Sequence, residues 1–368
     1  MAGRVPYTVA VTQHDLDLLD GVGGDGDDGS AGPPEDRPPR RRRRRVLVAV
    51  VTVLALVVAA VVGYVGFLGL TVSNNVSQED LLPEASTSIE ATAPDGTPIE
   101  VPEAGSGNGT NFLVIGSDTR GSDRGRSDVI VLVHVPQDPT SVQMIHFPRD
   151  LYVSIPGHGK NKINAAYAFG GAPLLVQTMQ NLLGVRIDHV ARTDFEGFKA
   201  MTDAVGGIRV YAEEGNNARG NGGVAIQKGW NDLDGEQALG FVRERYELSE
   251  GDISRGRRQL AVIKALLLKA TSKETITNPV RIARFTDAAT ENLVVDQDLT
   301  VGDMRDYAFE LRDLRSSDVV FATAPFTGFA MDPVAGSIDV VDVEGMDLLG
   351  KALRTDTMDD YLDVFVTP

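Results

Sequence analysis

The chain has 368 residues, of which 42% are hydrophobic, and this suits one large domain or two small ones with a sizeable core. It contains no cysteine, which excludes disulfide bonds, thiolate metal sites and a cysteine nucleophile. The formal net charge of −17 lies entirely on residues 71–368, where 27 Lys and Arg stand against 44 Asp and Glu, and such an acidic part argues against nonspecific nucleic-acid binding.

The N-terminal region combines a polar tail with an apolar segment. Residues 1–45 are rich in Gly, Asp, Pro and Arg, so we expect a disordered tail. Residues 46–70 are uncharged, and at about 1.5 Å per residue they can cross a hydrocarbon core of roughly 30 Å. A cleaved signal peptide fits less well, because the segment starts late and is long. Six arginines, Arg40–Arg45, precede it, and the positive-inside rule predicts a single-pass anchor with the N-terminus in the cytoplasm.

The remainder mixes strands and helices. Residues 71–107 contain the turn clusters "PDGTP" and "EAGSGNGT" and are predicted to form an extracellular stalk. Strands are predicted at 112–115, 129–135, 142–147, 151–155, 208–211 and 319–324. Helices are predicted at 164–169, 173–183, 195–205, 234–241, 255–270, 279–291 and 301–314. This order indicates a layered α/β domain, and the consecutive early strands indicate that part of the sheet is antiparallel.

Two aspartates flank the loop after the first predicted strand. If this strand and the next pair antiparallel, Asp118 and Asp128 lie at the feet of the loop, about 5 Å apart. Carboxylates that close repel unless a proton or cation intervenes, and an oxygen-only pair suits Mg²⁺ or Mn²⁺. The alternative is that both cap turns. The loop arginines Arg120, Arg124 and Arg126 favour the metal site.

Further arginines cluster near other predicted element ends. Arg149 directly follows a strand in "FPRDLYVSIPG". Arg243 and Arg245 are two residues apart, so in an extended segment both face one side. Planar guanidinium groups bind phosphate bidentately, which makes these residues candidate phosphate ligands.

A third group begins a predicted helix in "GDISRGRRQ". Arg255, Arg258 and Gln259 have i, i+3, i+4 spacing and are predicted to share one face, and Asp252 or Ser254 can cap the helix. Helix starts attract anions, so this segment is a candidate diphosphate cradle. The alternative is an ordinary wet surface on which these arginines pair with neighbouring acidic side chains.

Six segments resemble motifs of the LytR-CpsA-Psr family, in the family's order, over roughly residues 108–272. They are "FLVIGSDTR", "RSDVIVLVHV", "FPRDLYVSIPG", "KINAAYAFGG", "DFEGFKAMTDAVGGI" and "LDGEQALGFVRER…GDISRGRRQ". The resemblance implies a three-layer α-β-α domain with a mixed sheet, preceded by one transmembrane helix and a disordered tail. In this reading residues 108–272 form the catalytic core, and residues 273–368 complete the same domain.

The resemblance also implies an activity. It is that of a Mg²⁺-dependent phosphotransferase on the outer face of the cytoplasmic membrane, which moves a glycopolymer from a polyprenyl pyrophosphate carrier onto peptidoglycan through a phosphodiester bond. An apolar tunnel for the lipid is expected.

The abundance of Ala, Val, Gly, Asp and Arg is typical of a high-GC actinobacterial source.

The site residues follow by position from the same resemblance. Asp118 and Asp128 match the metal ligands, and together with Arg149 and Arg243 they are expected to be catalytic. The residues expected to bind pyrophosphate are Arg149, Arg243, Arg245, Arg255, Gln259, Asp252, Lys162 and Asn164. A general base is not evident, and Asp118 or Asp128 is the candidate.

Two other functions remain open at this stage. The first is a pyrophosphatase that acts on the same lipid-linked substrate with water as acceptor. The second is a non-catalytic, membrane-tethered adaptor that binds the cell wall. A serine hydrolase lacks support because no G-x-S-x-G motif is present.

Overall fold

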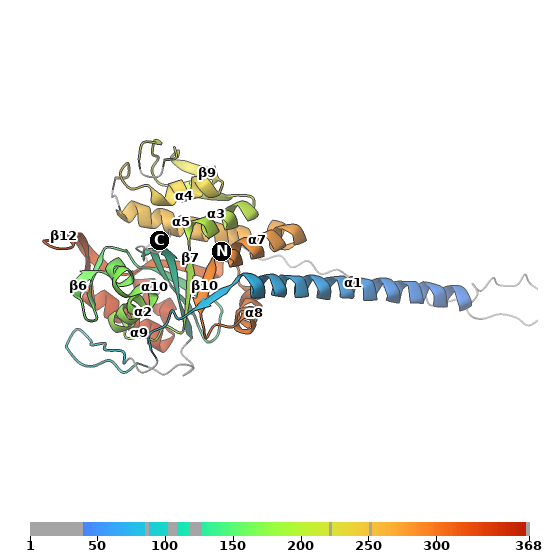
Figure 1. Cartoon of the computed structure of the whole chain (residues 1–368), viewed down its shortest axis with the longest axis horizontal. Coiled ribbons are helices and arrows are strands. Elements are labelled where there is room, and N and C mark those ends of the chain that lie inside the picture. The colour runs from blue at the N-terminus through green and yellow to red at the C-terminus, as the bar shows by residue number, and fades with distance from the viewer. Residues whose placement is uncertain are drawn as a thin grey trace, which may run out of the picture. The chain divides into compact units, whose positions relative to one another are not determined.

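The chain is described by a computed structural model (Figure 1). The described residues are 40–84, 88–101, 109–117, 127–220, 223–249 and 252–365. The chain divides into two units, residues 1–59 and residues 60–368, and each is described by itself.

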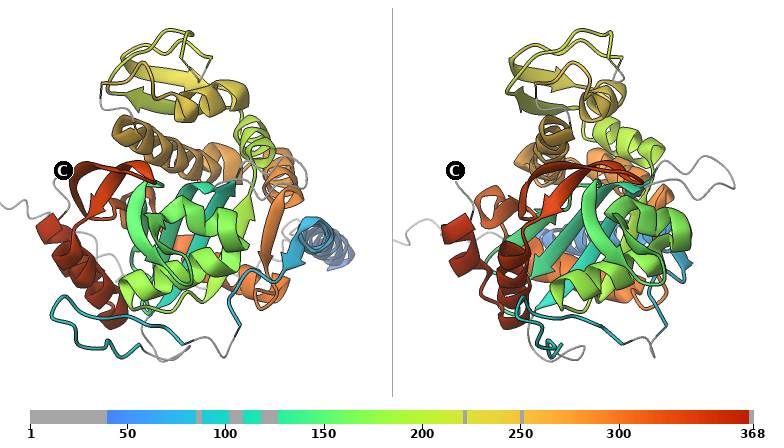
Figure 2. Two further views of the ribbon diagram at one scale, coloured as in Figure 1. Left: turned by 60° about the vertical axis from the view of Figure 1, so that its left-hand side comes forward. Right: turned by 90° about the vertical axis from the view of Figure 1, so that its left-hand side faces the viewer.

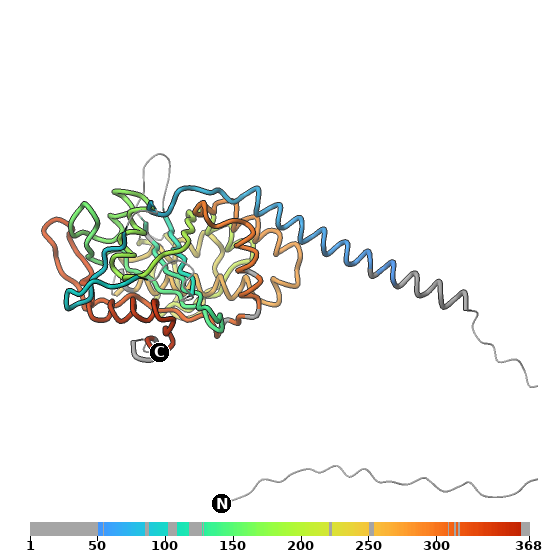
Figure 3. Tube along the Cα trace, turned by 90° about the horizontal axis from the view of Figure 1, so that it is seen from below, coloured from blue at the N-terminus to red at the C-terminus, as the bar shows by residue number. Residues whose placement is uncertain are grey.

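The apolar N-terminal segment lies in helix α1 (Arg40–Asn75), whose coloured part is one continuous helix in the trace of Figure 3. Within the described part of the chain, Val51–Asn75 is the one helix long and apolar enough to cross a membrane, with a mean hydropathy of 2.6. The helix exceeds the predicted range 46–70 at both ends, because no proline interrupts "RRRRRR" or "TVSNN". Of the predicted tail, residues 1–39 lie outside the described residues.

Seven strands of the described residues form the main sheet, in the order β1-β10-β7-β2-β3-β4-β11. They are β1 (Ser77–Glu79), β2 (Thr110–Ser117), β3 (Ser127–Val135), β4 (Val142–His146), β7 (His189–Thr193), β10 (Leu293–Asp296) and β11 (Val319–Thr323). The pairs β2–β3, β3–β4 and β7–β10 are antiparallel, and the other three are parallel. This mixed sheet confirms the α/β class and the antiparallel early strands.

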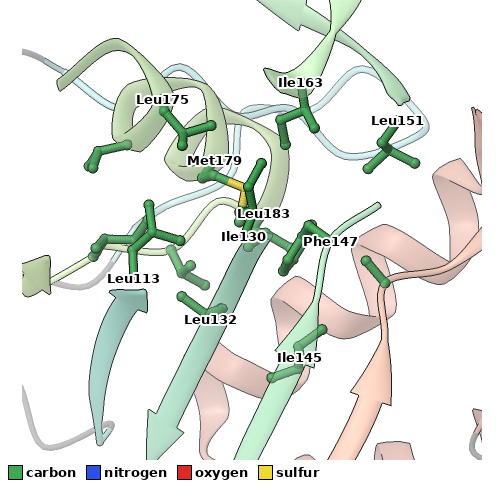
Figure 4. Close-up of a cluster of buried hydrophobic side chains, with 14 of the residues drawn as sticks. Leu113, Ile130, Leu132, Ile145, Phe147, Leu151, Ile163, Leu175, Met179 and Leu183 are labelled. Atoms are coloured by element: carbon green, nitrogen blue, oxygen red, sulfur yellow. The ribbon is translucent and has the colours of Figure 1, made fainter. Parts of the chain in front are cut away.

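Helices cover both faces of the main sheet. Leu113 of β2 is fully buried, and in Figure 4 it lies in one apolar cluster with Leu175 and Met179 of α2 (Ile163–Leu183). α9 (Val343–Thr355) contributes Leu349 to the same core. On the opposite face Phe112 packs edge-on against Tyr307 of α8 (Val301–Glu310), with ring centroids 5.0 Å apart. Burial of each large apolar side chain stabilises the fold by about 1.5–3 kcal/mol. Because helices lie on both faces of the sheet, the three-layer prediction is confirmed.

Helix α2 breaks where the sequence predicts a boundary. Gly171 has φ 70° and ψ −158° inside the helix, and Pro173 follows two residues later. Only glycine adopts this backbone conformation without strain, and proline offers no N–H to continue the ladder. The two helices predicted at 164–169 and 173–183 correspond to the two halves of α2.

Two smaller sheets complete the described part of unit 60–368, and Figure 2 shows their placement. One has the order β12-β13-β5-β6, formed by β12 (Phe326–Asp332), β13 (Gly336–Val341), β5 (Leu151–Ile155) and β6 (Gly159–Lys162). The other pairs β8 (Ile208–Ala212) with β9 (Gly229–Leu233). The second is packed with α3 (Phe195–Ala204), α4 (Gly235–Arg243) and α5 (Asp252–Ala270) around a separate core that includes Val210, Phe241 and Val262.

The other α-helices of the described residues are α6 (Lys273–Ile276), α7 (Pro279–Glu291) and α10 (Met358–Phe365). Two short 3-10 helices are η1 (Leu311–Asp313) and η2 (Ser316–Asp318).

The predicted stalk, residues 71–107, is partly built into the domain. Strand β1 pairs with β10, and Leu81 and Ala91 are buried. Asn75 donates a hydrogen bond of 2.9 Å to the Asp287 carboxylate of α7. These residues of the predicted stalk therefore pack against the domain. The three-residue strand of sequence "SQE" carries no apolar alternation from which it could be predicted.

Candidate functional site

One cavity of about 1030 Å³ collects most of the predicted site residues. The predicted residues that line it are Arg149, Lys162, Asn164, Arg243, Arg245, Arg255 and Gln259. Its apolar lining includes Ala165, Ala168, Phe169, Phe195 and Val242. Segments nearly a hundred residues apart therefore converge on one concave, electropositive surface.

The first wall of the cavity joins the end of β4 to the start of α2. Arg149 and Asp150 follow the strand, and the Asp150 carboxylate lies 3.8 Å from Arg149 Nε and 3.0 Å from Lys162 Nζ. Lys162 directly precedes α2 and caps it without a side-chain hydrogen bond. Asn164 does not serve as the cap: it is buried inside the first turn, and its N–H donates to the Arg149 carbonyl at 3.2 Å. Asp150 thus fixes two cations side by side at a helix N-terminus.

The second wall comes from the end of α4. Arg243 is the last helical residue and Glu244 is extended, so Arg243 and Arg245 both line the cavity, as their spacing predicted. The Arg243 guanidinium carbon lies 4.2 Å from the centroid of the Phe195 ring, and that of Arg245 lies 4.6 Å from the Tyr246 ring. Stacking on aromatic rings orients both guanidinium groups at the wall of the cavity.

Glu244 holds the turn between the two arginines. Its side chain is fully buried, and Oε1 accepts hydrogen bonds from the N–H groups of Arg245, Tyr246 and Glu247 at 2.9, 2.9 and 3.1 Å. The backbone of Gly220 lies directly against this carboxylate. Glu244 therefore fixes the chain direction that brings Arg245 to the cavity.

Replacing Glu244 by Ala is expected to destabilise the fold by about 1–3 kcal/mol, because it leaves buried N–H donors without an acceptor. Glu244→Gln keeps an acceptor oxygen and should lose less. Thermal unfolding of the full chain, followed by circular dichroism, measures the order wild type, Gln, Ala. Equal melting temperatures for all three would contradict the assignment.

The third wall is the first turn of α5. Arg255 and Gln259 are nearly fully buried and line the cavity. Arg258 was predicted to share their face, and this was wrong: it donates to Asn216 Oδ1 and to the Glu214 carbonyl, both at 2.8 Å. It stacks on Phe241, and burial lowers its pKa. Arg258 therefore anchors the loop after β8.

The predicted caps of α5 have different outcomes. Ser254 is not the N-cap, because it is the third residue of α5, and its hydroxyl donates to Glu214 Oε1 at 2.6 Å. Asp252 is the first residue of α5, and its side chain lies outside the described residues. The roles expected of Asp252, in capping the helix and in binding pyrophosphate, stay predictions.

His146 lies behind Arg255. Burial, and then the Arg255 charge, lower its pKa from 6.5 to about 4, against a hydrogen bond to the Gln259 side chain that raises it. The imidazole is therefore neutral at pH 7 and leaves the positive charge of this wall to Arg255.

This burial predicts an acid-sensitive contribution to stability. Because the folded-state pKa of His146 is below that of the unfolded chain, the unfolded state takes up the proton first as the pH falls. The free energy of unfolding should drop between pH 6.5 and about 4, by at most about 1.4 kcal/mol per pH unit. The free energies of unfolding of the wild type and of His146→Gln are measured by denaturation at pH 7.5, 5.5 and 4.5. The difference between these two free energies should change only below pH 6.5. A constant difference would contradict this.

The predicted metal site falls on the segment that joins β2 to β3 and on the start of β3. β2 and β3 pair antiparallel, Gly116 opposite Val129 and Ser117 opposite Ser127, so Asp128 is the extra residue of a β-bulge. Val129 lines the cavity. Asp118, the loop arginines Arg120, Arg124 and Arg126, and the side chain of Asp128 lie outside the described residues. Positions 118 and 128 adjoin the paired Ser117 and Ser127, as expected for the feet of one loop.

The surroundings of these positions fit a hard divalent cation. The Ser127 hydroxyl is fully buried and has no hydrogen-bond partner among the described residues. Mg²⁺ prefers oxygen ligands, and an ion bound beside Asp128 would give this buried hydroxyl oxygen a partner. No cluster of three His, Asp or Glu with metal-site geometry occurs in the described part of the chain.

Sequence reasoning missed several residues of the cavity. Asp150 stands next to Arg149 in a recognised motif and could have been found from its position there. Asp339 could not, because it reaches the cavity through β13, where its N–H donates to the Asp150 carbonyl at 2.9 Å. No local pattern links these two positions.

Comparison with known proteins gives the family. The family model described as LytR_cpsA_psr matches residues 78–348. This chain belongs to the LytR-CpsA-Psr family. This match confirms the family that the sequence motifs predicted.

Relatives within the LytR-CpsA-Psr family carry cell-wall names. A probable cell wall biosynthesis protein LcpB of Corynebacterium glutamicum is 36% identical over 67% of this chain and 61% of its own length. A polyisoprenyl-teichoic acid–peptidoglycan teichoic acid transferase TagU of Oceanobacillus iheyensis is 39% identical over 51% of this chain and 59% of its own. The matched part is thus about three fifths of each relative.

A solved structure of the same fold contains a ligand. The structure of B. subtilis TagT bound to LI-WTA superimposes with a TM-score of 0.56 at 26% identity, covering 73% of this chain and all of TagT.

Proposed function

We propose that this chain is a membrane-anchored phosphotransferase that moves a glycopolymer from a polyprenyl diphosphate carrier onto peptidoglycan. The convergence of Arg149, Arg243, Arg245 and Arg255 on one cavity carries the proposal. In a chain of net charge −17, such a local cluster of guanidinium groups suits a compact polyanion. The name of the relative TagU, a transferase between a polyisoprenyl-linked polymer and peptidoglycan, supports the same reaction.

In this proposal the arginines and Lys162 hold the oxygens of the diphosphate. Arg243 and Arg245 are oriented by aromatic stacking, and Arg149 and Lys162 by the shared Asp150 carboxylate. Preformed donors of this kind need no reorganisation when charge builds up on the leaving phosphate, and positioning with charge stabilisation is most of what phosphoryl transfer requires.

The apolar side of the cavity suits the isoprenoid part of the donor. Ala165, Ala168 and Phe169 of α2 line the same cavity as Phe195, Val242 and the arginines. A cavity whose lining combines charged and apolar side chains is complementary to the junction between a diphosphate and a hydrocarbon chain.

We propose Asp118 and Asp128 as ligands for Mg²⁺. A bound Mg²⁺ would supply Lewis-acid polarisation of a phosphoryl oxygen and neutralise part of the diphosphate charge. The buried Ser127 hydroxyl, which has no hydrogen-bond partner among the described residues, supports this proposal.

The proposed step exchanges one phosphorus–oxygen bond for another. A hydroxyl oxygen of peptidoglycan attacks the phosphorus that carries the polymer and loses its proton. The bond between that phosphorus and the bridging oxygen breaks, which leaves a phosphodiester on peptidoglycan and releases polyprenyl monophosphate. Asp118 or Asp128 is the proposed proton acceptor, since His146 is buried and its pKa is lowered to about 4.

The location proposed for this reaction is the outer face of the cytoplasmic membrane. Val51–Asn75 would span the bilayer once, and Arg40–Arg45 before it would remain in the cytoplasm. Cysteine-scanning accessibility on either side of the helix tests this orientation.

The decisive experiment supplies the purified full chain with a lipid-linked diphosphate donor, Mg²⁺ and peptidoglycan. A covalent polymer–peptidoglycan product and polyprenyl monophosphate are expected. Release of the monophosphate at an equal rate without peptidoglycan would indicate a pyrophosphatase instead. Binding to the wall with no turnover of donor would indicate the adaptor.

A further inference from the structure

The outer face of the β8–β9 sheet carries an exposed aromatic pair. Trp230, the only tryptophan in the sequence, is 63% exposed, and Tyr211 opposite it is 50% exposed. The two residues are cross-strand partners, and their rings meet edge to face with centroids 5.5 Å apart. The Arg209 guanidinium lies 5.5 Å from the Trp230 ring. Clusters of Trp, Tyr and Arg at the surface mark binding sites more often than chance.

Strand alternation fixes this exposure. Ile208 and Val210 of β8 and Leu233 of β9 point inward and belong to the core beneath the sheet. The residues between them must therefore face outward. Trp230 and Tyr211 are therefore held on a packed support and form a preformed platform. The β8–β9 sheet that carries them lies in the upper part of Figure 2.

The charges around the platform are already paired. Arg209 lies 3.9 Å from the Asp232 carboxylate, and Arg257 lies 3.0 Å from that of Glu213. The face therefore offers little net charge to a phosphate or a nucleic acid. It offers two exposed aromatic rings, set at 75° to each other, with hydrogen-bonding groups at their rim. A pyranose ring has the complementary structure: C–H groups of partial positive charge on one face, which stack on the negative face of an aromatic ring, and hydroxyls around its edge.

The platform adjoins the cavity across one helix. Tyr211 lines a small hollow together with Ser254 and Arg257 of α5. The same turn of α5 presents Arg255 and Gln259 to the cavity. An α-helix is about 10–12 Å across, so a polymer on the platform lies within a few sugar residues of the arginines.

We infer that the β8–β9 platform binds the sugar rings of a peptidoglycan glycan strand and so positions the acceptor. This inference rests on the proposed function for the identity of the polymer. Trp230 and Tyr211 stack on successive rings, and the paired charges hydrogen-bond to the ring hydroxyls.

The single tryptophan gives a direct test on the full chain in detergent. Titration with a soluble β-1,4-linked N-acetylglucosamine hexasaccharide should change the Trp230 emission in a saturable manner. Tyr211→Ala should weaken the sugar affinity about tenfold or more, the effect of losing one aromatic contact. Calorimetry should show no sugar binding for Trp230→Ala. The matched control is Phe309→Ala, which removes another exposed aromatic ring stacked on an arginine, Arg312 at 3.9 Å, and should bind the sugar normally.

A second measurement separates this inference from the proposed function. Trp230→Ala should raise the KM for peptidoglycan and leave the affinity for a polyprenyl diphosphate unchanged. Wild-type protein that gives no sugar response, with transfer that is unaffected by Trp230→Ala, would overturn the platform and leave the transferase intact. Sugar binding by a wild-type protein that transfers no polymer would support the platform and overturn the proposed transferase function. If the wild type is a dimer that gives no sugar response and Trp230→Ala is a monomer, the face serves self-association and the inference is overturned.

Discussion

Arg149→Ala is expected to lower the rate of polymer transfer by about 10²–10³-fold and to leave the chain folded. Arg149 is only 18% exposed, yet it lines the cavity and lies 3.8 Å from Asp150, so its guanidinium is fixed before a ligand arrives. Arg149→Lys keeps the charge but loses the planar fork, and an intermediate rate is expected. The initial rate of polyprenyl monophosphate release in the presence of peptidoglycan measures both.

The matched control for this prediction is Arg305→Ala. Arg305 is an exposed arginine of α8 that pairs with Asp306 at 2.8 Å and does not line the cavity. Its removal takes away the same charge and should leave the rate unchanged. If Arg149→Ala were folded and as fast as the wild type, Arg149 would have no role in the reaction.

The local part of the fold was accessible from the sequence. β2 and β3 are continuous apolar runs that indicated strands, and their closeness in the chain indicated antiparallel pairing. α4 was found from its cap, and Asp234 indeed forms a capping box with Gln237.

Long-range pairing was not accessible in the same way. β7, "HVART", and β10, "LVVD", are short and have no clear period, and only their neighbours make them strands. α9 is a different case, since Met346, Leu349 and Leu353 have helical spacing behind the cap Asp342. That signal was present in the sequence and was overlooked.

The arginine wall shows where sequence spacing is sufficient and where it fails. Arg243 and Arg245 share a side because Glu244 is extended, so a period of two applies. On α5, however, positions 258 and 259 differ by about 100° around the helix axis. Gln259 faces the cavity with Arg255, whereas Arg258 is held by Asn216 and the Glu214 carbonyl. Those partners come from a loop some 40 residues earlier, which no helical pattern could reveal.

The second large effect concerns the proposed metal site. Asp128→Asn is expected to lower transfer by at least about 10²-fold at a fixed Mg²⁺ concentration and to raise the Mg²⁺ requirement, because the amide keeps an oxygen but loses the negative charge. Asp118→Asn should behave alike. The double variant should be no worse than either single one, since both carboxylates act on the same ion.

Binding of Mn²⁺ to the full chain, counted by electron paramagnetic resonance, tests the site independently of turnover. One ion should bind the wild type and the exposed control Asp306→Asn, and binding to the two site variants should be weakened. Wild-type rates in excess chelator, or undiminished Mn²⁺ binding in both variants, would show that the bulge at Asp128 serves the fold alone. The metal is the stronger expectation, because the buried Ser127 hydroxyl beside the bulge has no hydrogen-bond partner among the described residues, and a bulge that served only to twist the strand would have no need of such an oxygen.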